Sequence, residues 1–142
     1  MSSESRRLSG ILLVVFPTVV FGGVSLLTLL VGDPRYMENA LRQDLWRAGH
    51  AHAGVLLVLS LLILRYVDDA RLSEQLKSFV RYAVPTAAIL LPLAFFFSVL
   101  RHDATEPNGF IYLAYIGAVV VSAGLLTLGI GILRSLKVGF TR

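Results

Sequence analysis

Three histidines are the side chains of this sequence with the clearest potential for chemistry. His50 and His52 lie among small residues in the stretch Arg47 to Gly54, and His102 lies in a later polar stretch. An imidazole can ligate a transition metal or haem iron, and it changes charge between about pH 5 and pH 8. Because the chain contains no cysteine, a metal would need histidine, carboxylate or carbonyl ligands.

The spacing of the histidines restricts such a site. On an α-helix, positions 50 and 52 are about 200° apart, so these two side chains cannot hold one ion between the same helices. His50 shares its predicted helix face with three small residues, Gly49, Ala53 and Gly54. His52 points the other way, toward lipid or a partner subunit. The metal or haem hypothesis therefore pairs His50 with His102 and keeps His52 in reserve; the alternative is three half-solvated interfacial histidines with no ligand.

Charged residues surround these histidines in the sequence. They are Asp44, Arg47, Arg101, Asp103 and Glu106. We expect them to form a hydrated cluster of ion pairs that contribute little individually, rather than an acid–base pair. No phosphate-binding loop, nucleophile elbow or His-Glu-x-x-His motif occurs, so the sequence does not indicate an enzyme.

Composition predicts the elements that position these residues. Of 142 residues, 56% are hydrophobic and 15% charged, with a mean hydropathy of +0.74, which is typical of an integral membrane protein. Four apolar stretches, at about 8–31, 47–66, 80–101 and 109–133, are long enough to cross a bilayer. We predict an all-α fold, a single membrane-embedded domain over residues 1–142 built as an up-down four-helix bundle. The sequence contains no basic face interleaved with aromatic residues, so it does not indicate nucleic-acid binding.

The connection between the first two spans carries a helix signal of its own. Asp33 can act as N-cap and Pro34 fits the first helical position. Three apolar residues recur at intervals of four, namely Met37, Leu41 and Leu45. We predict a short amphipathic helix from Asp33 to Trp46 that lies at the outer membrane interface. Ser73 is a candidate N-cap for the segment leading into the third span.

The cations predict the orientation of the chain. One set of span ends carries nine: Arg6, Arg7, Arg65, Arg71, Lys77, Arg81, Arg134, Lys137 and Arg142. The other set carries four: Arg35, Arg42, Arg47 and Arg101. By the positive-inside rule, both termini are cytoplasmic and the histidines are at the outer face of the cell membrane.

A row of glycines marks the fourth span. Gly117, Gly124 and Gly131 recur every seven residues, and small residues let helices approach closely in lipid. The first functional hypothesis is therefore a structural or accessory subunit that associates with itself or with a membrane complex through this row, with the outer charged cluster fixing the interface or sensing the outside pH. The second is a redox or metal-binding protein that uses His50 and His102. The third is an oligomeric channel lined by hydroxyl groups of the spans.

Two resemblances accompany these hypotheses. Gly49 to Leu56 resembles the start of the histidine-bearing helix in relatives of haem-copper oxidase subunit I. The later histidines that this family uses are missing here, so its haem ligation is not carried over. The whole chain looks like small four-helix integral membrane proteins of bacteria, a resemblance that implies a topology and no activity.

Overall fold

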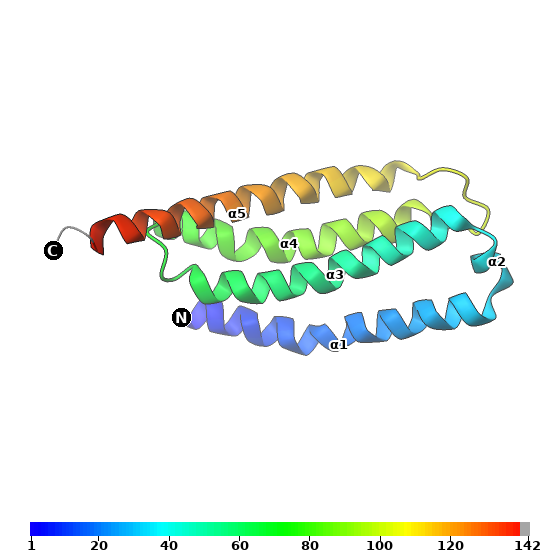
Figure 1. Cartoon of the computed structure of the whole chain (residues 1–142), viewed down its shortest axis with the longest axis horizontal. Helices are drawn as coiled ribbons and strands as arrows, with labels where there is room; N and C mark the ends of the chain where they lie inside the picture. The colour runs from blue at the N-terminus through cyan, green and yellow to red at the C-terminus, as the bar shows by residue number, and fades with distance from the viewer. Residues whose placement is uncertain (140–142) are drawn as a thin grey trace.

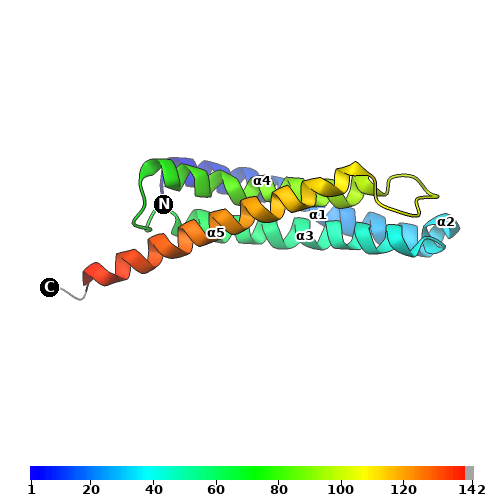
Figure 2. The ribbon, with the colours of Figure 1, turned by 90° about the horizontal axis from the view of Figure 1, so that it is seen from above.

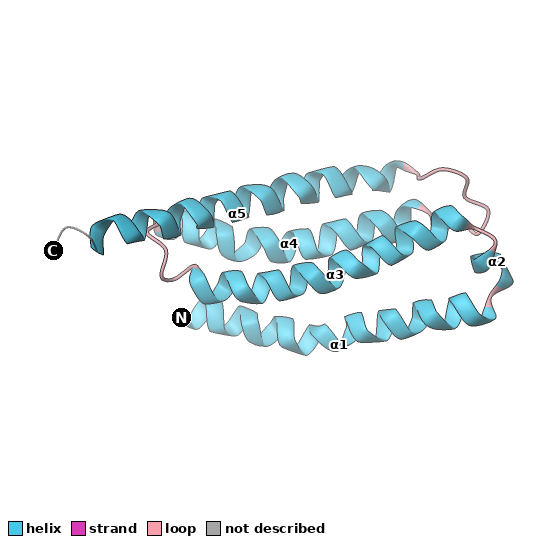
Figure 3. Ribbon diagram, in the orientation of Figure 1, coloured by secondary structure: helices cyan, strands magenta, loops and turns pink. Residues whose placement is uncertain are grey.

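The computed structural model describes residues 1–139, with side chains described through Ser135. In this part of the chain, helices, turns and loops are present and there is no strand (Figure 3). The elements in order are α1 (Ser3–Gly32), α2 (Pro34–Met37), α3 (Ala40–Tyr66), α4 (Glu74–Ser98), the 3₁₀ turn η1 (Gly109–Ile111) and α5 (Tyr112–Gly139). The predicted all-α class is confirmed.

Four of these helices are long and apolar enough to cross a membrane. They have 30, 27 and 25 residues for α1, α3 and α4, and 27 for the stretch Gly109–Ser135, where about 20 suffice. The chain reverses direction between successive long helices, so α1 begins and α5 ends at the same end of the bundle (Figure 1). We call this the terminal end, and the other the far end. Of the predicted terminal cations, Arg142 and the side chain of Lys137 lie outside the described residues.

The first connection differs from the prediction. Asp33 caps α2 with its side chain and Pro34 begins it, as predicted, but α2 ends after four residues. Asn39 then accepts a hydrogen bond from the Arg42 backbone N–H at 2.9 Å and caps a new helix. An asparagine side chain at this position competes with continued backbone hydrogen bonding and so interrupts the helix. The prediction of a single amphipathic helix from 33 to 46 is therefore wrong. Residues from Ala40 onward belong to α3, which is about 40 Å long at 1.5 Å per residue.

The predicted helix cap at Ser73 is confirmed. The Ser73 side chain accepts a hydrogen bond from the Leu76 N–H, so α4 begins at Glu74, six residues before the predicted start of the third span at about residue 80. Three prolines lie inside helices, Pro17 in α1 and Pro85 and Pro92 in α4. An internal proline removes a backbone hydrogen bond and bends a helix, and Figure 1 shows α1 bent near its middle.

The hydrophobic core is formed by α3, α4 and α5. One buried cluster joins Ile63, Val80, Val84 and Leu128, and a second joins Leu56, Ala87, Ala88 and Leu91. α5 runs obliquely to α3 and α4 (Figure 2). α1 adds no apolar residue to this core; its single buried residue is Ser5. The fold is thus a three-helix core with α1 attached beside it.

Candidate functional site

The far end of the bundle holds a contact between a buried arginine and a histidine. Arg42, in the first turn of α3, is 5% exposed, and its Nη1 lies 2.6 Å from Nδ1 of His102 in the loop between α4 and η1. The Asn39 side-chain amide donates to the backbone oxygens of His102 and Ala104 at 2.9 and 3.0 Å. The start of α3 therefore holds this loop through one side-chain and two backbone acceptors.

Aromatic rings enclose the other side of Arg42. Its guanidinium lies 4.0 Å from the Trp46 ring centroid, a cation–π distance. Trp46 packs on Tyr36 and Phe96 with ring centroids 5.7 and 5.9 Å away, and its indole N–H donates to the Phe96 carbonyl at 3.1 Å. Nε of Arg42 is buried without a hydrogen-bond partner among the described residues. This guanidinium is therefore held rigidly and has little access to water.

The other two histidines face different neighbours. His50 packs between α3 and α1, where its imidazole Nε2 lies 3.0 Å from the position that a Cβ on Gly23 would occupy. Nδ1 of His52 lies 2.7 Å from the Ala48 carbonyl oxygen, and its ring centroid is 5.2 Å from that of Phe95 on α4.

The structure does not bring His50 and His102 together. His102 contacts Arg42, which precedes His50 by eight residues on α3, or about 12 Å of helix rise. Nδ1 of His102 is also occupied by a cationic donor. Among the described residues, no group of three His, Asp or Glu side chains is placed to hold a metal ion. The residues present therefore do not fit a metal or haem iron shared by this pair.

The predicted outer charged cluster divides into two local ion pairs. Arg47 donates a hydrogen bond to Asp44 at 2.6 Å within α3. Arg101 donates to both carboxylate oxygens of Asp103 at 3.0 and 2.8 Å within the loop. All four side chains are more than half exposed. Glu106 lines a cavity of about 280 Å³ together with Arg101 and Asp103, but it forms no ion pair with Arg101 or Arg47 in the described part of the chain. No single network joins these residues in the part of the chain that the structure describes.

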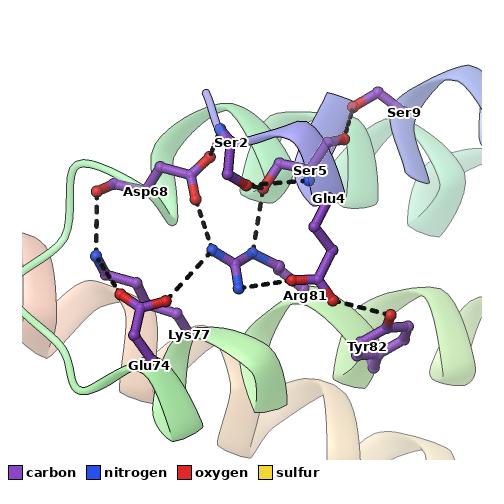
Figure 4. A network of polar contacts seen from close by, with 9 residues as sticks. All are labelled: Ser2, Glu4, Ser5, Ser9, Asp68, Glu74, Lys77, Arg81 and Tyr82. Carbon is purple, nitrogen blue, oxygen red and sulfur yellow. Dashed lines mark hydrogen bonds and ion pairs between the residues drawn. The ribbon is translucent and has the colours of Figure 1, made fainter. Parts of the chain in front are cut away.

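A denser polar cluster lies at the terminal end, around Arg81 of α4 (Figure 4). Arg81 is 5% exposed, and its guanidinium donates to Ser5 Oγ at 3.2 Å, to Glu4 at 3.1 Å and to Asp68 at 2.7 Å. Tyr82 donates its hydroxyl to the other oxygen of Glu4 at 3.0 Å. The arginine thus joins α1, the α3–α4 loop and α4.

Asp68 accepts the two shortest hydrogen bonds of this cluster. Besides Arg81, the backbone N–H of Ser2 donates to it at 2.6 Å. Burial alone raises the pKa of Asp68, but the hydrogen bonds from Arg81 and Ser2 outweigh burial and hold that pKa well below its usual range. Asp68 therefore stays ionised through neutral and mildly acidic pH.

Sequence reasoning missed the role of Arg42 and Arg81, which it treated as boundary cations. One signal was available for Arg81. The Ser73 cap begins α4 at Glu74, which places Arg81 two turns inside the helix, where an arginine needs partners. Its partners Glu4 and Asp68 carry no comparable signal.

The glycine row of α5 faces α4 and the adjoining loop inside the chain. A Cβ on Gly117 would collide with Leu91, one on Gly124 would lie 3.0 Å from the Ala83 Cβ, and one on Gly131 would lie 2.6 Å from the Leu72 Cγ. The three glycines therefore pack helices within the chain, and α4 and the adjoining loop cover this face of α5. On α3, Gly49 packs closely on Phe95 and Phe96, while a Cβ on Gly54 would lie 3.7 Å from Val19; Ala53 is half-buried.

Several hydroxyl groups in the long helices donate hydrogen bonds to their own backbone. Donors to a carbonyl three or four residues earlier are Thr18, Ser25, Thr28, Ser60, Ser98 and Thr127. Hydroxyls satisfied in this way do not line a polar path, so the geometry gives the channel hypothesis no support.

The fold and these clusters define the class of protein as an all-helical bundle whose four long helices have the length and apolarity of membrane spans. Comparison of the chain with protein-family models, with curated proteins and with solved structures finds no match.

Proposed function

We propose that this chain is a multi-pass protein of the cell membrane, with both termini cytoplasmic, that acts as a structural or accessory subunit and associates through α1. The observation that carries the proposal is how little of α1 is buried. In the most apolar 18 residues of α1 no residue is buried, whereas 44% of the corresponding stretch of α4 is buried. α1 is held at the terminal end by Glu4 and Ser5, and its apolar middle is left open.

The contact between α1 and α3 supports the same proposal. It uses small groups, since Gly22 and Gly23 face His50 and Gly54 faces Val19. Beside it lies an apolar cavity of about 400 Å³ lined by residues of both helices, namely Phe16, His50, Ala51, Gly54, Val55 and Val58. Helices in lipid associate through close packing of such small-residue surfaces. A further helix that packs beside α1 would bury surface that this chain alone leaves exposed.

The absence of cysteine allows a direct test in membranes. Single cysteines replace Val14 and Phe21 on α1, which are 80% and 73% exposed, and Val119 on α5, which is 69% exposed, serves as the matched control. We expect oxidative cross-linking to a second chain or a partner at the α1 positions and much less at position 119. Equal cross-linking at all three positions, or none together with a 15.5 kDa monomer by light scattering after mild extraction, would overturn the proposal.

A further inference from the structure

We propose that the contact between Arg42 and His102 is sensitive to protons: the neutral imidazole holds the far-end loop on α3, and protonation of His102 releases it. The proposal is independent of association through α1, because the contact joins α3 to the loop before η1 within one chain and includes no residue of α1.

The chemistry of the two groups fixes the protonation state of His102. A guanidinium has only N–H donors and keeps its charge at any pH near neutral. Nδ1 of His102, 2.6 Å from Arg42 Nη1, must therefore be the acceptor and carries no proton, which leaves the hydrogen of the neutral ring on Nε2. Protonation at Nδ1 replaces this bond with two donors and two positive charges facing each other.

Arg42 cannot move to accommodate an imidazolium. It is 5% exposed, it stacks on Trp46, and its Nε already lacks a partner among the described residues. His102, in contrast, is exposed and lies on a loop. The histidine is therefore the side that leaves when the contact breaks, and solvent protons reach it directly.

The other charged groups near His102 keep their charge over the same pH range, so they do not compete with it as the proton-sensitive group. Those that line the same cavity of about 540 Å³ are Arg35, Glu38 and Asp103. Arg35 pairs with Asp33 at 3.7 Å, and Asp103 is bonded by Arg101. The hydrogen bond from Arg101 lowers the pKa of Asp103 and burial raises the pKa of Tyr36, so neither group changes charge between pH 5 and pH 8. Glu38 remains as the carboxylate that can receive the displaced imidazolium.

His52 provides an internal contrast. Its Nδ1 lies 2.7 Å from the Ala48 carbonyl oxygen, which can only accept, so this Nδ1 carries the hydrogen. Protonation of His52 at Nε2 leaves that bond intact. Two histidines of one chain thus respond to acid in opposite ways because their partners differ.

Trp46 reports on the contact, since it is the only tryptophan of the chain and stacks on Arg42. In mild detergent, we expect the Trp46 emission of the natural chain to change in a single one-proton step as the pH is lowered from 8. His102→Asn, which keeps a neutral acceptor near the place of Nδ1, is expected to abolish it. His50→Asn and His52→Asn are the matched controls and are expected to keep it. A flat titration of the natural chain, or a transition that survives in His102→Asn, would overturn the proposal.

A second measurement follows the loop in the otherwise natural chain. A spin label on Thr105→Cys is unique because there is no other cysteine. We expect its mobility to rise severalfold from pH 8 to pH 5, and the rise to disappear when His102→Asn is added. Mobility that stays constant with pH would refute the release of the loop.

Discussion

Replacing Arg81 with methionine removes the cation at the centre of the terminal-end cluster while keeping a long side chain. Three contacts of 2.7 to 3.2 Å are lost, to Asp68, Glu4 and Ser5. Asp68, whose side chain is 14% exposed, keeps the Ser2 N–H but loses its counter-ion. Breaking a fully buried pair costs about 3–5 kcal/mol, and because Asp68 and Glu4 keep some contact with water, we expect a loss of about 2–4 kcal/mol in the free energy of unfolding.

The matched control is Arg101→Met. The Arg101–Asp103 contacts are as short as those of Arg81, but the two side chains are 82% and 71% exposed. Water replaces such contacts almost without loss, so this variant should unfold almost like the natural chain. The measurement is loss of helical circular dichroism during a dodecyl sulfate titration in mixed micelles. Equal destabilisation by the two substitutions would refute the argument that burial, rather than the geometry of the ion pair, decides the contribution.

Two further predictions use the same unfolding measurement. Gly124→Leu should lower the free energy of unfolding by about 1–3 kcal/mol, since a Cβ there already lies 3.0 Å from the Cβ of Ala83. Gly129→Leu is the control and should cause no loss, because the space around Gly129 is open. Similar losses at both sites would contradict the packing of α5 on α4. The contribution of Asp68 should be constant from pH 8 to pH 5, because a pKa lowered by folding gives stability that is present above the unfolded value of about 3.9 and is lost as the pH falls toward the folded value. Asp68→Asn should remove this acid sensitivity, and an unchanged loss of stability below about pH 4 in that variant would contradict the assignment.

The local features of the fold were predictable from short stretches of sequence. Asp33 before Pro34 marked a helix start, and Ser73 marked another, because a cap needs only the next three residues to form its hydrogen bond. The break at Asn39 is different. The apolar residues at intervals of four predict one continuous helix, whereas the Asn39 side chain caps the start of α3 and ends that continuity.

The candidate site was predicted much less well, and His102 shows why. The sequence singles out His102 and predicts His50 as its partner, whereas the structure places His102 against Arg42, 60 residues away in the chain. Spacing on one helix says which residues share a face, and it says nothing about which loop residue that face meets. The glycine row has the same history: its close packing was expected, while its partner within the chain was decided by how α5 lies on α4.

By itself, the sequence determined that this chain forms long apolar helices, because about 20 apolar residues in a row can satisfy their backbone in lipid only within a helix. It also determined the helix caps and the small-residue rows. Only the tertiary structure decided that α1 stays outside the core, that Arg81 of α4 binds Glu4 from 77 residues earlier, and that Arg42 fixes His102 as an acceptor. The physical reason is that backbone hydrogen bonds are local to each segment, whereas burial of a charge depends on side chains that folding brings together from distant segments.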